Sequence, residues 1–204
     1  MTRRAIVFGG TFDPVHLGHL AVAEQVLARS GAGALWFVPA DVPPLRPPAL
    51  ATLPERIAML RAAAQGQRAY AVLDTEMRRG GVSYTSATIA QLHAERPDAE
   101  LAILLGADAA RTIARWPGHE QLLSDEHFVI VNRTGAAPFD RVDATAAGYD
   151  PARTAILEIQ SPPISASEVR RRAAAGEPLD GLVAPPVAAL IRELGLYRSG
   201  AGRA

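Results

Sequence analysis

The chain has 204 residues, of which 49% are hydrophobic, so it is long enough to bury the core of one α/β domain. Its 21 basic side chains are balanced by 21 acidic ones, which argues against binding to nucleic acid, because that binding depends on excess positive charge. The absence of cysteine excludes disulfides, cysteine-based zinc sites and a cysteine nucleophile. We expect a single domain over residues 1–204, in the cytoplasm, with no membrane partner, since no apolar run is long enough to span a bilayer.

The first forty residues predict a strand, a helix and a second strand. The apolar run at 5–8 ends in Gly9-Gly10 and is typical of a buried parallel strand followed by a glycine turn. Helical periodicity follows over 19–29 and stops near Gly31. Another apolar run at 34–38 predicts the second strand, which makes this unit a right-handed crossover.

The rest of the chain continues the alternation. The proline-rich stretch 39–48 and residues 133–151 are expected to be loops. Further strands are expected over 70–74, 101–105, 127–131 and 155–159, and further helices over 53–64, 83–95, 167–175 and 184–194, with a short one opening at 106–108. The pattern predicts an α/β fold with one doubly wound, Rossmann-like parallel sheet, helices on both faces, and a C-terminal helical part at about 163–198. Ligands of such sheets bind beyond the carboxyl ends of the strands.

The segment 9–19, Gly-Gly-Thr-Phe-Asp-Pro-Val-His-Leu-Gly-His, carries the strongest functional signal. Its two leading glycines allow backbone amides to approach a charged ligand. His16 and His19 are three residues apart, so they share one face of a first helical turn, and Gly18 leaves room for a ligand between them. The segment predicts a polyphosphate site. The alternative is a tight turn followed by a helix that the histidines cap.

A second candidate anion site lies at 164–170. Ser165 and Glu168 have the spacing of a capping box, so a helix is expected to begin here. Hydroxyl groups together with Arg170 at a helix start can bind an anion. The alternative is an ordinary helix cap followed by a solvated, arginine-rich face.

Together these segments resemble the two signatures of the nucleotidylyltransferase superfamily. Residues 16–19 match His-x-Gly-His, and residues 164–170 match Ile-Ser-x-Thr-x-Ile-Arg, with Ser167 in place of threonine and Val169 in place of isoleucine. The resemblance implies an enzyme that uses ATP with Mg²⁺ and has no metal ligands of its own. It implies catalytic roles for His16, His19 and Arg170. The residues it implies for ATP binding are Gly9, Gly10, Thr11, Phe12, His16, Gly18, His19, Gly106, Asp108, Ile164, Ser165, Ser167 and Arg170.

The middle of the chain resembles the nicotinate mononucleotide adenylyltransferases. The segments that carry this resemblance are 42–47, 83–88, 105–108, Trp116 and the C-terminal 195–198. It implies adenylyl transfer from ATP to nicotinate mononucleotide, giving deamido-NAD and pyrophosphate. A pyridine ring can stack on Trp116, and the amides of a helix beginning at Thr85-Ser86 can bind a carboxylate. The residues implied for this substrate are Arg46, Thr85, Ser86, Trp116 and Arg133.

Several alternatives remain open from the sequence. Trp116 could be a core side chain and Asp108 a helix N-cap. Leu45 stands where the family usually has histidine, so the role of that histidine is not carried over to this loop. The acceptor could instead be nicotinamide mononucleotide or phosphopantetheine. The chain could also be a cytidylyltransferase or a non-catalytic nucleotide-binding module, and a homo-oligomer is possible.

Overall fold

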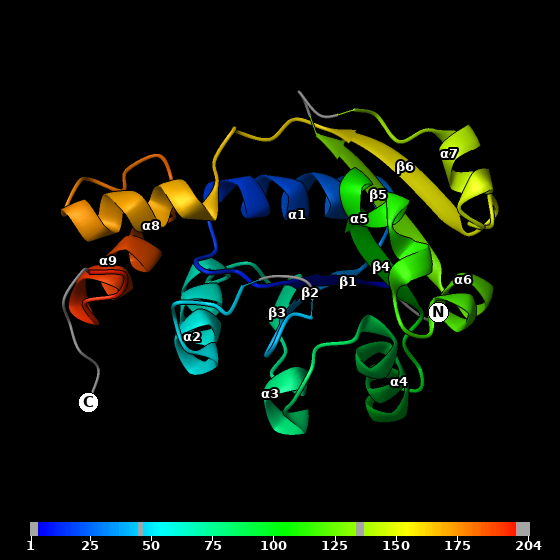
Figure 1. Ribbon diagram of the computed structural model, residues 1–204, viewed down its shortest axis with the longest axis horizontal. Helices are drawn as coiled ribbons and strands as arrows, with labels where there is room; N and C mark the ends of the chain where they lie inside the picture. The colour runs from blue at the N-terminus through cyan, green and yellow to red at the C-terminus, as the bar shows by residue number, and fades with distance from the viewer. Residues whose placement is uncertain (1–3, 45–46, 134–136, 199–204) are drawn as a thin grey trace.

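The computed structural model describes residues 4–44, 47–133 and 137–198. Its centre is a parallel sheet of six strands in the order β3-β2-β1-β4-β5-β6 (Figure 1). The strands are β1 Ala5–Gly10, β2 Ala34–Pro39, β3 Tyr70–Val72, β4 Leu101–Gly106, β5 His127–Arg133 and β6 Thr154–Ile159. The order reverses between β1 and β4, which confirms the predicted doubly wound sheet and places its switch point there.

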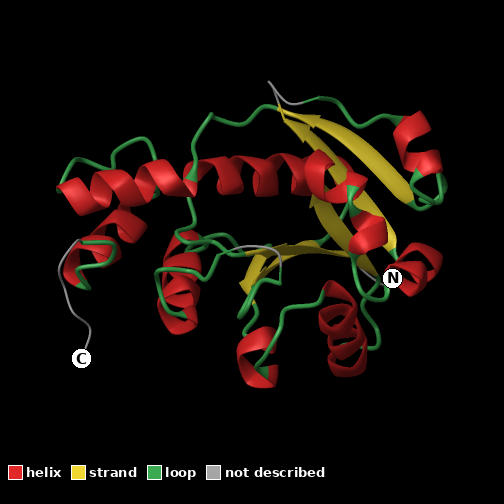
Figure 2. Ribbon diagram, viewed as in Figure 1, coloured by secondary structure: helices red, strands yellow, loops and turns green. Residues whose placement is uncertain are grey.

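Helices cover both faces of the sheet, as predicted (Figure 2). Neighbouring residues of one strand enter different cores: Ile6 belongs to the first and Val7 to the second. The helices contributing to the first core are α1 Leu17–Ser30, α2 Leu53–Ala63, α8 Ala166–Ala175 and α9 Pro185–Glu193. The second core is completed by α4 Thr85–Glu95, α5 Ala107–Arg111, α6 His119–Asp125 and α7 Arg141–Ala146, with the 3₁₀ turn Ile113–Arg115. None of the helices in the described ranges could span a bilayer.

Three short helices were not predicted, among them α6, which lies between the 3₁₀ turn and β5. The stretch 133–151 was expected to be a loop, but it contains α7, whose N-cap Asp140 accepts hydrogen bonds from the N–H groups of Val142 and Asp143 at 2.8 and 2.9 Å. Helix α3, Thr75–Arg79, lies between β3 and α4. Helices of five to seven residues are too short to show a clear helical period, so the pattern missed all three.

The predicted glycine turn is also corrected. Gly9 and Gly10 are the last two residues of β1, and neither has a positive φ. The chain turns afterwards, and the residue with the left-handed backbone is Phe12, at φ 50°. A buried phenylalanine rather than a glycine makes the turn. Phenylalanine rarely adopts a positive φ, so its residue type did not predict a turn at this position.

The N-termini of α1 and α8 lie next to each other beyond the carboxyl end of β1 (Figure 1). The hydroxyl of Ser161, in the segment that leads to α8, lies 3.4 Å from the carbonyl oxygen of Gly18. The positive ends of two helix dipoles therefore point toward one region at the switch point of the sheet.

Candidate active site

His16 and His19 form a stacked pair at the start of α1. His16 is the N-cap residue, and its backbone N–H donates to Nδ1 of His19 at 3.3 Å. The two imidazole rings lie 3.7 Å apart between centroids, with an angle of 26° between their planes. The structure thus confirms that the two histidines share one face at the helix N-terminus.

The imidazole of His16 is 5% exposed. Burial, and next the positive charge of Arg133, lower its pKa to about 4. Its Nδ1 is buried and has no hydrogen-bond partner among the described residues. At neutral pH His16 is therefore an uncharged ring with one unsatisfied nitrogen, which suits a hydrogen bond to a ligand rather than a fixed charge.

Two glycines make room for this arrangement. A Cβ on Gly10 would lie 2.9 Å from the ring of Phe12, and a Cβ on Gly18 would lie 3.0 Å from the ring of His16. The Phe12 ring is buried and meets His19 edge to face at 5.0 Å between centroids. Phe12 therefore supports His19 with its side chain, which leaves only its backbone for a nucleotide.

Gly9 differs from Gly10 and Gly18. It is exposed at the end of β1, and a Cβ there would meet nothing within 4 Å. Packing within the protein does not require glycine at this position. The space above Gly9 is open to a ligand that approaches the sheet at its switch point.

The second motif begins α8 and reaches the first. Ser165 is the N-cap and accepts from the N–H of Glu168 at 3.2 Å, but the carboxylate of Glu168 pairs with Arg171 and Arg172 instead of completing the predicted capping box. Arg170 donates from Nη2 to the Ser167 hydroxyl at 3.2 Å and from Nη1 to the carbonyl of Asp13 at 2.7 Å. The two motifs are therefore joined by a direct hydrogen bond.

The residues predicted for the pyridine end of the acceptor also lie together. Thr85 and Ser86 begin α4, and the Ser86 hydroxyl donates to the carbonyl of Pro117 at 2.7 Å, next to the half-buried ring of Trp116. Gly118 permits this contact, because a Cβ there would lie 2.8 Å from that of Ser86. Trp116 packs against the second core but is only partly buried, so part of its surface remains exposed.

Gly106, Asp108 and Arg133 lie at or just after the carboxyl ends of strands. Gly106 ends β4 and is the N-cap of α5, so Asp108 is not a cap but an exposed residue of the first helical turn. Arg133 is the last residue of β5, is exposed, and acts electrostatically on His16. Arg46 and Leu45 lie outside the described residues.

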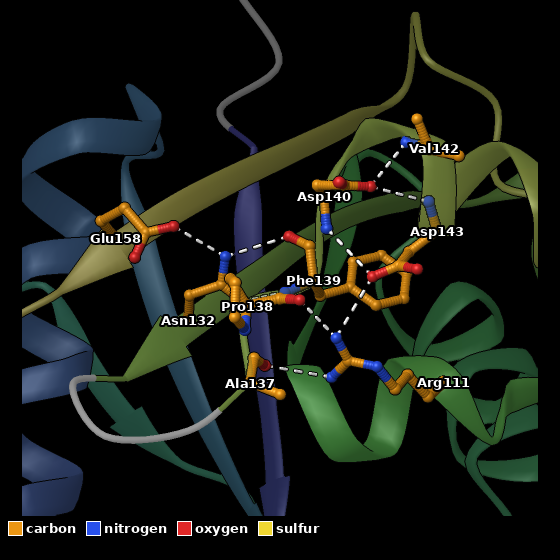
Figure 3. A network of polar contacts seen from close by, with 9 residues as sticks. All are labelled: Arg111, Asn132, Ala137, Pro138, Phe139, Asp140, Val142, Asp143 and Glu158. Atoms are coloured by element: carbon orange, nitrogen blue, oxygen red, sulfur yellow. Dashed lines mark hydrogen bonds and ion pairs between the residues drawn. The ribbon is translucent and has the colours of Figure 1, made fainter.

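A polar network holds residues 137–139 against β5 and α5 (Figure 3). The side-chain amide of Asn132 accepts from the N–H of Phe139 at 2.8 Å and donates to its carbonyl at 3.0 Å and to Glu158 at 2.7 Å. From the other side, Arg111 donates to the carbonyls of Ala137 and Pro138. Asn132, the residue before Arg133, thereby ties β5 to β6 and to the segment that leads into α7.

Known proteins resemble the chain over nearly its whole length. Residues 7–172 match the family model of cytidylyltransferase-like proteins. A probable nicotinate-nucleotide adenylyltransferase of Symbiobacterium thermophilum is 40% identical over 200 residues, covering 97% of this chain and 96% of the relative. The one from Shouchella clausii is 36% identical over 196 residues, covering 96% and 97%. The chain belongs to the nicotinate-nucleotide adenylyltransferase family.

Solved structures share this family's fold. Nicotinic acid mononucleotide adenylyltransferase from Plasmodium falciparum, complexed with NaAD, superposes with a TM-score of 0.77 at 18% sequence identity, covering 96% of this chain and 97% of that one. At this identity the likeness establishes the Rossmann-like architecture, and roles of single residues have to be argued from the chain itself.

Arg56 on α2 is a buried residue near the family's histidine motif that the sequence analysis missed. It is 2% exposed and donates to the carbonyls of Thr11 at 2.8 Å, Ala40 at 2.6 Å and Ala51 at 3.1 Å. Burial lowers the pKa of this guanidinium, against the opposing effect of Asp13 and other nearby acidic groups. The sequence feature that could have revealed its burial is its position: Arg56 lies among the apolar residues of α2 that face the core.

We expect Arg56→Lys to lower the free energy of unfolding by about 2 kcal/mol, because one ammonium group cannot reach three carbonyls that the planar guanidinium joins. Arg61→Lys is the matched control, since Arg61 is an exposed arginine on the same helix, and its effect should stay within about 0.5 kcal/mol. Urea denaturation measures both. Equal stability of the two variants would contradict a structural role for Arg56.

The low pKa of His16 predicts a loss of stability in acid. Between pH 6.5 and about 4 the unfolded chain binds a proton at this position that the folded chain does not, so stability falls as pH falls and levels off below about 4. We expect the wild type to lose about 3 kcal/mol more than His16→Gln between pH 7 and pH 4. Denaturation curves at several pH values test this, and parallel profiles for the two proteins would disprove it.

Proposed function

We propose that the chain transfers the adenylyl group of ATP to nicotinate mononucleotide, releasing pyrophosphate and forming nicotinate adenine dinucleotide, and that it acts in the cytoplasm. The observation that carries this proposal is the hydrogen bond between Arg170 and the Asp13 carbonyl, which joins the two phosphate motifs in one place. The names of the relatives, which match over nearly the full chain, support the choice of acceptor.

The phosphates of ATP are proposed to lie between the N-termini of α1 and α8. Here the stacked histidines, the amides of both helix starts and Arg170 surround one region. The open space above Gly9 and the exposed hydroxyls of Ser165 and Ser167 adjoin it. Thr11, Phe12, Gly106, Asp108 and Ile164 complete the proposed ATP site, Phe12 through its backbone.

The reaction requires positioning more than proton transfer. A phosphate oxygen of the acceptor attacks the α-phosphorus of ATP in line, and the bond to the β-phosphate breaks as pyrophosphate leaves. The nucleophile is already anionic, so no general base is needed. His16, His19 and Arg170 donate hydrogen bonds to the oxygens on which charge accumulates.

We propose that Mg²⁺ enters with ATP as part of the substrate. Across residues 4–44, 47–133 and 137–198, no three histidine, aspartate or glutamate side chains are grouped so that they could hold a metal ion. Phosphate oxygens and water then supply the ligands that a hard cation prefers.

The acceptor's pyridine ring is proposed to stack on Trp116, with its carboxylate at the N-terminus of α4. The N-cap Tyr84 has no side-chain hydrogen bond to the first turn, so the N–H groups of Thr85 and Ser86 can donate to a carboxylate. Nicotinamide mononucleotide carries a neutral amide in place of this carboxylate. The helix N-terminus favours an anion, so the site should prefer the acid form of the substrate. Arg133 and Arg46 are proposed for the acceptor's phosphate.

His19→Ala should lower kcat by about 100- to 1,000-fold, the usual cost of removing one donor to transition-state charge. Pyrophosphate release from ATP and nicotinate mononucleotide with Mg²⁺ measures it. His93→Ala is the control, because His93 is an exposed histidine on α4 paired with Glu126. Full activity of His19→Ala would exclude the proposed role of the pair.

Trp116→Ala should raise KM for nicotinate mononucleotide about tenfold while KM for ATP is unchanged, because only the acceptor loses a stacking surface. Trp116→Phe should recover most of the affinity. The same assay with nicotinamide mononucleotide tests acid selectivity, and preference for the amide would overturn the proposed role of Thr85 and Ser86. Turnover of phosphopantetheine alone would reassign the acceptor.

A further inference from the structure

Asp13 lies three residues before His16 and is almost completely buried, with 5% of its surface exposed. Its carboxylate accepts three hydrogen bonds, from the N–H of Leu50 at 2.8 Å, the N–H of Ala51 at 3.1 Å and the hydroxyl of Tyr197 at 2.8 Å. A buried carboxylate is stable only where donors surround it, so this side chain fixes three segments of the chain relative to one another.

The main chain of Asp13 holds Arg170. Nη1 of Arg170 donates to the Asp13 carbonyl at 2.7 Å and lies 3.9 Å from its carboxylate. The side chain of Arg170 remains 27% exposed, so part of the guanidinium faces outward. The direction in which Arg170 presents its other donors therefore depends on the position of the Asp13 peptide.

Tyr197 follows Leu196, which is anchored in the first core. Burial, and then the charge of Asp13, raise the pKa of the Tyr197 phenol, so its hydroxyl keeps the proton that it donates. Among the described residues other than glycine, positive φ occurs at Phe12, at 50°, and Tyr197, at 65°. Phe12 directly precedes Asp13, and Tyr197 is the other partner of this hydrogen bond. Such unfavourable backbone persists where surrounding contacts enforce it.

We propose that Asp13 and Tyr197 are positioning residues that set the orientation of Arg170 toward the phosphates of ATP. The inference rests on the proposed function for the identity of the anion. Removal of the Tyr197 hydroxyl takes one donor from the Asp13 carboxylate, and the peptide that holds Arg170 then loses its fixed position.

Tyr197→Phe tests the proposal because it deletes one oxygen and keeps the ring. Tyr149→Phe is the matched control: Tyr149 is buried in the second core, and its hydroxyl donates to the carbonyl of Ala110 at 3.2 Å. We expect Tyr197→Phe to lower kcat about tenfold and to raise the Kd for MgATP roughly fivefold, with KM for nicotinate mononucleotide unchanged. Tyr149→Phe should lower the melting temperature similarly and leave kcat and Kd unchanged.

The same substitution in an Arg170→Lys background separates positioning from general stability. If Tyr197 acts through Arg170, its effects on kcat and Kd shrink to less than about twofold in that background. Unchanged kcat and Kd in Tyr197→Phe, or equal effects in both backgrounds, would overturn the proposal. Calorimetry measures the Kd for MgATP in the absence of any acceptor, so it tests the positioning role by itself. Inactivity of the wild-type protein on nicotinate mononucleotide would refute the proposed function and leave this test of Tyr197 intact.

Discussion

The geometry of the candidate site depends on the buried guanidinium of Arg56. A charge in the interior is tolerated only if its donors are matched by acceptors. Arg56 finds these in carbonyls from the turn after β1, from the residue that follows β2 and from the residue before the N-cap of α2. The same turn carries Asp13 and leads into the histidine pair. One buried cation and one buried anion thus brace a main chain that has no regular secondary structure of its own.

This bracing allows phosphate recognition with little free positive charge. His16 is neutral at physiological pH, and Arg170 already donates to Ser167 and Asp13. What remains is a set of oriented donors: two helix starts, two imidazoles and the outward part of one guanidinium. A chain of zero net charge can therefore have an anion site, because the donors are concentrated at the switch point.

The sequence predicted most of the sheet because strands such as β4 and β5 contain continuous apolar runs of strand length. It predicted the histidine pair because three-residue spacing is a local property of a helix. It failed where stability comes from a cap, as at α7, or from an unusual backbone, as at Phe12. Asp13 and Arg56 were missed for another reason: Asp13 meets Tyr197 184 positions away, and Arg56 meets Thr11 45 positions away. No local pattern reports such contacts.

The order of the strands has a consequence for synthesis on the ribosome. β1 pairs with β2 after a short crossover, but its other neighbour is β4, so that Ala5 pairs with Leu101 only after nearly a hundred residues have emerged. Until then one edge of β1, whose first three residues are buried in the folded protein, has unmatched amides and carbonyls next to apolar side chains. The strand that leads into the histidine motif is therefore the one most exposed to mispairing and aggregation while the chain is being made, and dependence on chaperones should be greatest in that interval.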